Sequence, residues 1–325
     1  MMEPVLSICI PIYNRSSCLV EMLDRFLEDR DLFEEKIFLY ISDNDSKEDL
    51  KAIVEDYRGK GLNVHYHRNA QNIGGDMNIC ACYRAGRGKY TLVLGSDDIP
   101  QRGFLRRLLP LLEEGEFGLV HINIYNRKKD WTVKDYSDSD QFFMDMHGWI
   151  TLISINIVAT RFIPLVEIEK FVDKNFSQIP LYLKAGSESQ VNRVIHHSFL
   201  TGTEDGNPAD TAGYNAFQVF IVNFLELMNG AVKAGQISRK AFRTIKRRSY
   251  KYLITQHIVN LLILKRTNYN HNKGGGWKIV FKYYGMHLYA YYYLIWRVCY
   301  ASFHLLFVKK LGWGKKRVIQ GGSDV

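Results

Sequence analysis

Apolar runs and amphipathic stretches alternate along residues 1–100 of this 325-residue chain. Runs rich in β-branched residues predict buried strands, and apolar residues at helical spacing predict helices between them. The expected strands lie at residues 5–14, 36–41, 63–66 and 90–94, and the expected helices at residues 19–27, 48–57 and 76–85. Ser16 or Ser17 is a suitable N-cap for the first helix. This alternation predicts an α/β fold with a mostly parallel, doubly wound sheet and right-handed crossovers.

Polar side chains lie at the ends of three expected strands. Tyr13 is at the end of the first, and Asp43 and Asp97 come just after the second and the fourth. In open parallel sheets, ligands bind beyond the carboxyl ends of the strands. We therefore expect these three residues to line one crevice.

Two adjacent acids, Asp97 and Asp98, follow the fourth strand after a Gly95-Ser96 turn. Carboxylates this close repel each other unless a cation or a proton lies between them. Oxygen ligands on a turn suit Mg²⁺ or Mn²⁺, which bind through one or two carboxylates and the phosphates of a substrate. The ordinary alternative is a strand end followed by a solvated Asp-Asp turn.

In order and spacing, these segments resemble the GT-A-fold, family 2 nucleotide-sugar glycosyltransferases over about residues 5–165. The resemblance implies a Rossmann-like GT-A domain. It implies that Tyr13 lies against the base, that Pro11 and Arg15 shape the nucleotide loop, and that Asp43 contacts the base edge or the ribose. The residues that it assigns to nucleotide-sugar binding are Pro11, Tyr13, Asn14, Arg15, Asp43, Asn72, Gly74, Gly75, Ser96 and Asp97.

The metal motif of the family is incomplete in this chain. Gly95-Ser96-Asp97-Asp98 stands where the family usually has Asp-X-Asp-Asp, so that Gly95 replaces the first acid. The resemblance then makes Asp97 the main ligand of Mg²⁺ or Mn²⁺, with Asp98 beside it. The preceding segment 72–76 resembles the branch that adds deoxy- or dideoxyhexoses to O-antigen, of which abequosyltransferases are typical.

The resemblance implies that an acceptor hydroxyl attacks the anomeric carbon with inversion while a carboxylate acts as general base. Family members carry this acid after a strand that lines the acceptor site, expected here at 149–158, but residues 176–180 contain no acid. Glu188 is the nearest downstream carboxylate and our preferred candidate. The alternatives are Glu204 and Asp205. An ordinary helix-terminal or loop role is open for each of the three.

The length of the chain allows two domains. We expect a catalytic domain at residues 1–210, with a nucleotide half at about 1–100 and an acceptor half at about 101–210, and a helical region at 211–325. The five cysteines form no C-x-x-C pair, which favours reduced thiols in the cytosol and argues against zinc. The chain begins without a signal-like segment, since its first apolar run is short and is interrupted by Pro11.

The region from residue 233 onward carries 19 Lys and Arg residues against one acid, Asp324, although the net charge of the chain is only +9. A tract rich in Tyr and Trp runs through residues 277–313. Long aliphatic runs such as 305–308 suit lipid better than bases, so we expect no nucleic acid. A transmembrane helix at 285–308 would bury Arg297. An interfacial helix on an anionic membrane fits best, and helices packed on the catalytic domain are the ordinary alternative.

Together these features predict a glycosyltransferase of bacterial surface polysaccharide or O-antigen synthesis. It would be peripheral on the cytoplasmic face of the cell membrane and act on a lipid-linked glycan. One alternative is a nucleotidyltransferase, which would carry a Gly-rich loop after the first strand, whereas residues 13–17 contain no Gly. Another is a catalytically inactive GT-A scaffold at the membrane surface, suggested by Gly95 and the missing late acid. No feature of the sequence specifies an oligomeric state.

Overall fold

The computed structural model describes residues 3–123, 131–202, 214–264 and 274–303. The chain forms two compact units. The first unit contains the described parts of residues 1–207 and 223–246, and the second contains those of residues 208–222 and 247–325. Thus the catalytic region expected from the sequence and the segment 223–246 form one unit.

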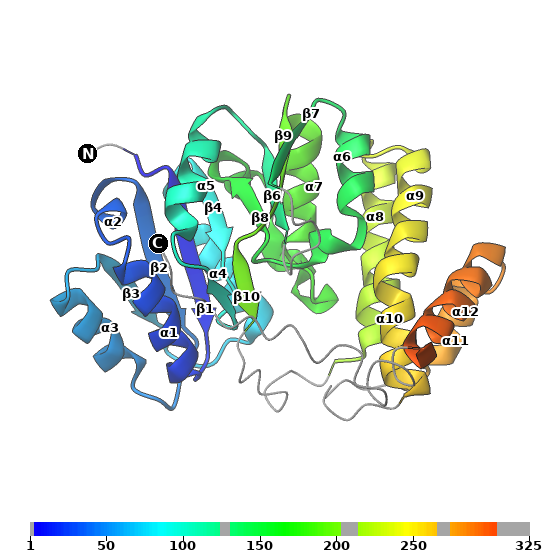
Figure 1. Cartoon of the computed structure of the whole chain (residues 1–325), viewed down its shortest axis with the longest axis horizontal. Coiled ribbons are helices and arrows are strands. Elements are labelled where there is room, and N and C mark those ends of the chain that lie inside the picture. Colours follow the sequence, from blue (N-terminus) through cyan, green and yellow to red (C-terminus); the bar gives the residue numbers. More distant parts are fainter. Residues whose placement is uncertain (1–2, 124–130, 203–213, 265–273, 304–325) are drawn as a thin grey trace. The chain divides into compact units, whose positions relative to one another are not determined.

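An eight-stranded sheet in the order β3-β2-β1-β4-β8-β6-β9-β7 forms the centre of the first unit (Figure 1). The strands are β1 (Leu6–Ile12), β2 (Ile37–Asp43), β3 (Val64–Arg68), β4 (Tyr90–Val93), β6 (Leu119–Asn123), β7 (Thr132–Tyr136), β8 (Asn156–Ala159) and β9 (Asn192–Ser198). Strands β7 and β8 run antiparallel to their neighbours, and the other six share one direction. The predicted mostly parallel α/β sheet is confirmed.

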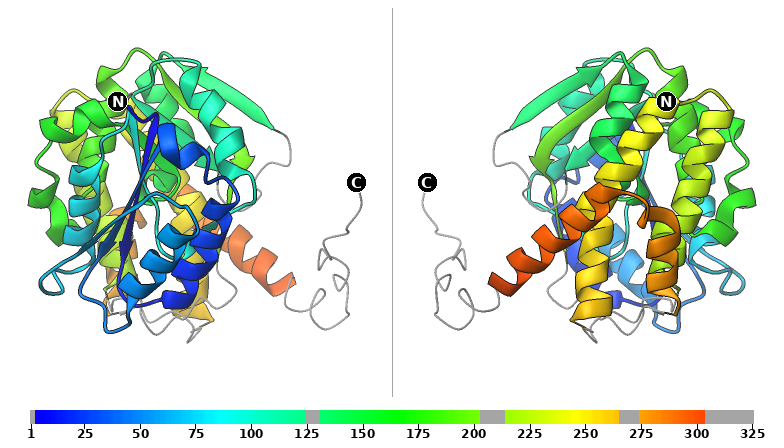
Figure 2. Two further views of the ribbon diagram at one scale, coloured as in Figure 1. Left: turned by 90° about the vertical axis from the view of Figure 1, so that its left-hand side faces the viewer. Right: turned by 90° about the vertical axis from the view of Figure 1, so that its right-hand side faces the viewer.

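Helices connect the strands of the first half; three of the four match predicted helices, and the short helix at residues 32–35 is not predicted by the sequence. They are α1 (Ser16–Leu27), α2 (Leu32–Glu35), α3 (Leu50–Gly59) and α4 (Gly75–Ala85). In β1 every residue except Pro11 is buried, which is typical of a central parallel strand. Helices cover both faces of the sheet (Figure 2), so the sheet is doubly wound.

The prediction of a single strand over residues 149–158 is wrong for the first half of that range. Residues His147–Thr151 form the 3₁₀ turn η1, and the strand β8 begins only at Asn156. Thr151 Oγ1 donates to the carbonyl of Gly148 at 2.7 Å, and Asn156 Nδ2 donates to that of Leu152 at 2.6 Å. Such local bonds from side chain to backbone compete with strand pairing and favour a turn.

The second half of this unit adds a two-stranded antiparallel sheet and further helices. The small sheet pairs β5 (Asp98–Pro100) with β10 (Leu200–Gly202). The helical elements are α5 (Phe104–Glu113), α6 (Ser139–Met146), η2 (Thr160–Leu165), η3 (Ile168–Lys174), α7 (Ile179–Glu188), α8 (Phe224–Lys233) and α9 (Arg239–Ser249, whose residues after 246 belong to the second unit). Gly202 pairs with Asp98, the first residue of β5. The small sheet therefore begins at the Asp97-Asp98 turn, which follows β4 along the chain.

The described part of the second unit is helical, as predicted. Its elements are η5 (Gln218–Asn223, which reaches the first unit), η6 (Tyr250–Ile254), α10 (Thr255–His257), η7 (Ile258–Ile263), α11 (Gly276–Tyr284) and α12 (Leu288–Phe303). The rings of Tyr250 and Tyr284 are buried with their centroids 4.4 Å apart. Among the described helices, none combines the length and apolarity needed to cross a membrane.

All five cysteines are free thiols. Cys9, Cys80 and Cys82 are buried. Burial raises the pKa of the Cys9 thiol, which keeps it protonated and unreactive. These cysteines are therefore part of the core.

Ser7 joins the first strand to the entry of the fourth, and its removal should destabilise the fold. Its buried Oγ accepts the backbone N–H groups of Arg87 at 2.9 Å and Gly88 at 2.7 Å. Ser7→Ala would leave both donors without this acceptor, and we expect the free energy of unfolding to fall by about 1–3 kcal/mol. Urea denaturation measures this change. Ser302→Ala, at an exposed position, is the matched control, and equal stability of the two variants would contradict the role of Ser7.

Candidate active site

Three loops meet at the carboxyl edge of the central strands. Strand β1 lies between β2 and β4, and all three are parallel. Ile12 is paired with Asp43, and Cys9 is paired with Val93. The residues after these strands therefore project from one edge of the sheet, which brings Tyr13, Asp43 and Asp97 to the same edge.

A carboxylate that sequence reasoning missed, Glu48, shapes the loop after β1. Its oxygens accept the backbone N–H groups of Arg15 at 3.2 Å and Ser16 at 2.7 Å. A hydrogen bond from the Ser16 side chain, together with these two backbone bonds, lowers the pKa of Glu48. The N-cap residue of α1 is Arg15, so the predicted cap by Ser16 or Ser17 is wrong. No local sequence signal links an acid more than thirty residues away to this helix start.

Asn14 links the loop after β1 to the loop after β2. Its N–H donates to Ser46 Oγ at 2.7 Å, and its Oδ1 accepts the N–H of Lys47 at 2.9 Å. Asn14 and Arg15 both have positive φ angles, 57° and 62°. The loop is thus held in a tight left-handed turn that leaves the side chain of Tyr13 40% exposed, while Pro11 remains partly exposed within β1.

Asp43 is completely buried and holds the turn that follows β2. Its Oδ1 accepts the N–H of Ser46 at 2.8 Å, and its Oδ2 accepts the hydroxyl of Tyr66 at 2.5 Å. Burial and this bond to Asp43 raise the pKa of Tyr66. Arg68 adds a longer ionic contact at 3.7 Å. Both oxygens of Asp43 are therefore already bonded within the protein.

Asparagine side chains connect the start of α4 to the same edge. Asn72 Oδ1 accepts from Asn44 Nδ2 and from the N–H of Gly74, both at 2.9 Å. Gly74 has a φ of +85° and open space around it, so that the backbone turns sharply at the exposed start of the helix. Gly75 is exposed beside it. Asn72 thus holds the backbone at Gly74. Because Gly74 and Gly75 have no side chains, the backbone at the start of α4 is left uncovered.

Asp97 and Asp98 converge on Gly95. A Cβ added at Gly95 would lie 3.1 Å from Asp97 Oδ1 and 3.4 Å from Asp98 Oδ2. Ser154 Oγ accepts the N–H of Gly95 at 2.8 Å. The Arg15 guanidinium lies 3.5 Å from Asp97 and donates to Ser96 Oγ at 3.2 Å. The structure therefore brings Arg15, Ser96, Asp97 and Asp98 together.

The two carboxylates differ in environment. Asp97 is more than half exposed, whereas Asp98 is largely enclosed. Burial raises the pKa of Asp98 to about 6, with repulsion from Asp97 adding to the rise and a hydrogen bond from Ser154 opposing it. A carboxylate that is costly to ionise without a neighbouring cation is typical of a metal or proton site.

The donor set at this turn fits a divalent cation that also binds phosphate. Two carboxylates leave most coordination positions of Mg²⁺ or Mn²⁺ to water and substrate oxygens. Within the described residues, no group of three or more His, Cys, Asp or Glu side chains is arranged to hold a metal. The arrangement thus suits an ion shared with a ligand and not a closed structural metal site.

Glu188, the preferred general base, does not reach this site. It ends α7 and forms an ion pair with Lys184 at 2.5 Å, and the chain then enters the amino end of β9. Strand β9 is parallel to β6, which shares the direction of β1 and β4. Glu188 therefore lies at the opposite edge of the sheet from Asp97. Glu204 and Asp205 lie outside the described residues.

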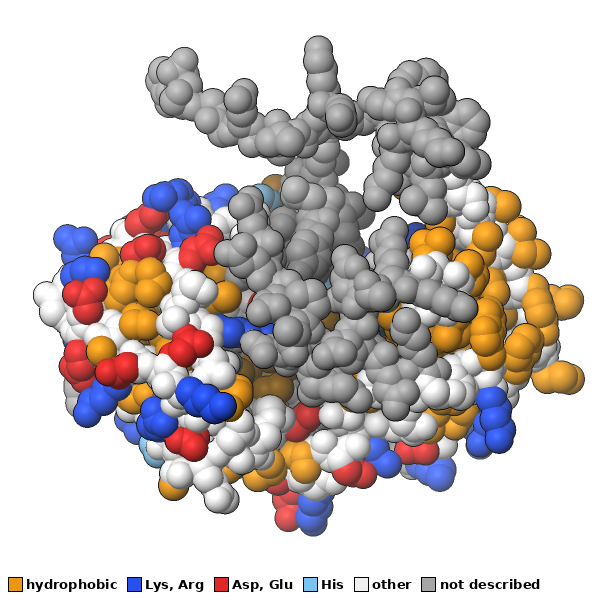
Figure 3. Space-filling view, turned by 90° about the horizontal axis from the view of Figure 1, so that it is seen from below, with side chains coloured by type: hydrophobic (Ala, Val, Ile, Leu, Met, Phe, Trp, Pro, Cys, Tyr) orange, Lys and Arg blue, Asp and Glu red, His pale blue; other side chains and the backbone are white. Residues whose placement is uncertain are grey.

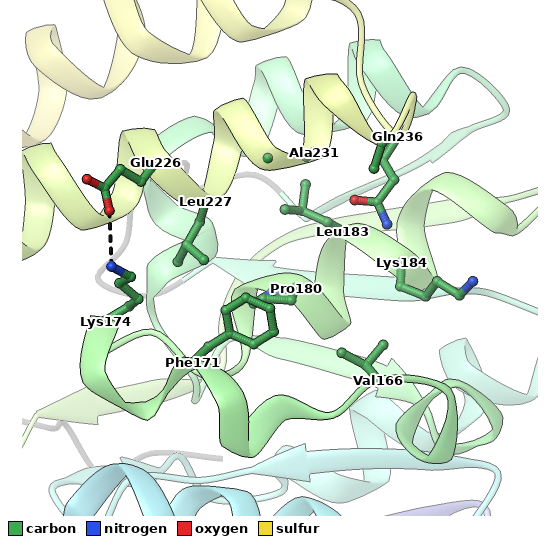
Figure 4. Close-up of a pocket in the computed structure, with 12 residues that line it drawn as sticks. Val166, Phe171, Lys174, Pro180, Leu183, Lys184, Glu226, Leu227, Ala231 and Gln236 are labelled. Carbon is green, nitrogen blue, oxygen red and sulfur yellow. Dashed lines mark hydrogen bonds and ion pairs between the residues drawn. The ribbon is translucent and has the colours of Figure 1, made fainter.

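A separate cavity of about 470 Å³ lies between η3, α7 and α8 (Figure 4). Its walls are mainly apolar, with Phe171, Leu183 and Leu227 among them, and a Lys174–Glu226 ion pair of 3.1 Å at one side. None of the candidate site residues lines it. It is distinct from the crevice at the strand ends.

Asp98→Asn should stabilise the protein in the absence of metal. The pKa of Asp98 is about 6 in the fold and about 3.8 when unperturbed, so the carboxylate destabilises the fold as the pH rises through this interval. We expect the free energy of unfolding to rise by an amount on the order of 2 kcal/mol at about pH 8 and to stay unchanged at about pH 4. Thermal unfolding in EDTA measures the stability at both pH values, with Asp56→Asn, at an exposed position of α3, as the control. An equal gain at both pH values would contradict this assignment.

The fold of the chain is that of known GT-A glycosyltransferases. S. aureus TarS 1-349 in complex with UDP-GlcNAc aligns with a TM-score of 0.59 and 17% identity, over 80% of this chain and 77% of that one. The mannosyltransferase PcManGT from Pyrobaculum calidifontis, in complex with GDP-Man and Mn²⁺, aligns with a TM-score of 0.53 and 12% identity, over 97% and 84%. At these identities the likeness shows the fold alone.

Sequence comparison identifies the family. The abequosyltransferase RfbV of Salmonella typhimurium is 29% identical over 141 residues, which are 40% of this chain and only 42% of that relative. The model of the family "Glycosyl transferase family 2" matches residues 7–163, which include β1 to β4, the Asp97-Asp98 turn and β8. Residues 7–163 therefore form a glycosyl transferase family 2 domain.

Proposed function

We propose that this protein transfers a sugar from a nucleotide-diphosphate donor to a hydroxyl of a glycan acceptor in the synthesis of a bacterial surface polysaccharide such as O-antigen. The observation that carries this proposal is the convergence of Asp97, Asp98 and Arg15 at the carboxyl edge of β1 and β4. Family membership supports it. So do the UDP-GlcNAc bound by TarS and the abequosyl transfer in the name of the relative.

The donor would lie along the three loops at this edge. Tyr13 offers an exposed ring on which the base can stack. Asp43 positions the following turn, because its oxygens bond Ser46 and Tyr66. The exposed backbone at Gly74 and Gly75 allows the donor to approach the start of α4.

The diphosphate would lie against Arg15, Ser96 and the two acids. Arg15 can donate to phosphate oxygens, and its present partner Asp97 is exposed enough for the ion pair to open. Mg²⁺ or Mn²⁺ held by Asp97 and Asp98 would supply Lewis-acid stabilisation of the leaving diphosphate. The Mn²⁺ in the PcManGT complex supports this assignment. Ser154 would orient Asp98, which it contacts from the β8 side.

The acceptor would be a lipid-linked glycan, and its hydroxyl would attack the anomeric carbon with inversion. An enzyme that uses a membrane-borne acceptor and a soluble donor has to work at the membrane surface. The basic, aromatic C-terminal region supports a peripheral location on the cytoplasmic face of the cell membrane. We do not retain Glu188 as the base, since it lies at the opposite edge of the sheet.

Asp97→Asn should abolish sugar transfer while the protein remains folded. The substitution removes one of the two anionic ligands from the proposed cation site, and we expect activity to fall by at least ~100-fold. The measurement is Mn²⁺-dependent transfer from a panel of radiolabelled sugar nucleotides to native lipid-linked acceptors. Asp56→Asn, which makes the same change at an exposed position of α3, is the control. Transfer by Asp97→Asn at the wild-type rate would refute the metal assignment, and no wild-type transfer with any donor would favour an inactive scaffold.

A thermal-shift screen should identify the donor nucleotide. Conjugates of UDP, GDP, CDP and dTDP are compared with and without Mn²⁺. Because a ligand that binds only the folded state raises the melting temperature, we expect one nucleotide class to stabilise the protein in a Mn²⁺-dependent manner. Tyr13→Ala should reduce this shift, while Val20→Ala, which also shortens an exposed side chain of this region, should not. No shift with any conjugate would count against donor binding.

A further inference from the structure

The exposed side of α12 is an apolar and aromatic face. Leu288 is 88% exposed, Tyr292 65% and Ile295 63%, and these residues follow one another at helical spacing. The face continues along the same side of the helix. Its further members are Tyr291, Trp296, Cys299, Tyr300 and Phe303. Large hydrophobic side chains exposed in one contiguous stripe mark a surface that meets another apolar phase.

The one charged residue of α12, Arg297, is directed to the protein side. Its guanidinium donates to Gln256 Oε1 of α10 at 2.9 Å. On the preceding turn, the hydroxyl of Tyr293 accepts from the Arg247 guanidinium at 3.0 and 3.2 Å. The Arg297 charge, which argues against burial of this segment in lipid, is thus bound to the protein. The exposed stripe itself contains no charged residue.

Cations border this face, and acids are missing around it. The described residues 214–222, 247–264 and 274–303 contain no Asp or Glu. On α11, Lys278 and Lys282 are exposed beside Trp277 and Phe281. In Figure 3 the hydrophobic side chains at the right, where α11 and α12 lie, gather on one surface, with Lys and Arg at its margin. This unit therefore presents an uncharged centre within a positive field.

We propose that this face of α12 binds the interface of an anionic lipid bilayer, with the helix lying in the plane of the membrane. Because Arg297 binds Gln256 on the protein side, α12 offers lipid one face only, as a helix lying in the interface does. Tyr and Trp are side chains that favour the headgroup zone. The inference deepens the proposed function by assigning its membrane contact to one helix face, and it rests on that function only for the choice of a cell membrane.

Charge complementarity distinguishes this partner from two others. A second copy of the chain would bring further cations and, from the described part of this unit, no acids, so the paired faces would repel each other. A nucleic acid would need cations between the aromatic side chains, whereas Leu288, Tyr292 and Ile295 form an uncharged stripe. Anionic lipid satisfies both the apolar centre and the positive margin.

Vesicle flotation with the full chain tests the proposal, using Ile295→Glu as the variant. Leu165→Glu is the matched control, since Leu165 is an aliphatic residue of similar exposure, 60%, in the first unit. With vesicles of phosphatidylcholine and about one third phosphatidylglycerol, we expect Ile295→Glu to bind at least ~10-fold more weakly than the wild type. We expect Leu165→Glu to bind like the wild type, and neutral phosphatidylcholine vesicles to bind all three more weakly.

Three results would overturn the proposal. One is absence of wild-type binding to the anionic vesicles, and another is equal binding by Ile295→Glu. The third is a change in sedimentation that shows Ile295→Glu to dissociate an oligomer without any effect on lipid binding. Tryptophan fluorescence adds a direct readout, because insertion of Trp296 should shift its emission to shorter wavelength, and Trp296→Phe should remove that component.

The same proteins distinguish this inference from the proposed function. Donor-induced thermal shifts are measured without lipid, and Ile295→Glu should retain the wild-type shift. If vesicle binding fails while the donor shift persists, the α12 inference is wrong and the sugar-transfer proposal stands. If no donor shifts the melting temperature while vesicle binding persists, the sugar-transfer proposal is wrong and the α12 inference stands.

Discussion

The parallel pairing of β1 with both β2 and β4 is the constraint on which the candidate site depends. Parallel neighbours end at the same edge, so residues separated by more than eighty positions project together from that edge. The registers that pair Ile12 with Asp43 and Cys9 with Val93 fix the relative heights of the loops. Without this pairing, Arg15 would not lie beside Asp97.

Much of the polar chemistry at this edge serves the backbone. Glu48, Asn14 and Asp43 accept hydrogen bonds from main-chain N–H groups of the loops that follow β1 and β2. These N–H groups have no partner within the sheet, and the side chains satisfy them. Asp97 and Tyr13 differ from them because their side chains are substantially exposed. Polar residues at the site thus divide into those that hold the loops and those that remain available to a ligand.

The sequence was sufficient for the first half of the sheet because its signals are local. Apolar runs and helical spacing placed β1 to β4 and the helices between them, and the Asp97-Asp98 turn was found at the expected edge. Glu48 and Ser154 were missed, since each acts through a tertiary contact that no spacing reveals. Glu188 was chosen by chain distance, but the parallel course of β6 and β9 places it at the other edge. The strand expected at 149–158 failed because side chains such as Thr151 bond the local backbone.

The left-handed conformation of Asn14 and Arg15 has a consequence for how this sequence can vary. A non-glycine residue in that region costs on the order of 1 kcal/mol, and here two occur in succession. The bonds from Ser46, Lys47 and Glu48 offset this cost, so the conformation of one loop depends on residues of the other. We expect positions 14–15 and 46–48 to change together among homologues. A substitution in one segment that destabilises the loop by itself should be tolerated when a matching substitution occurs in the other.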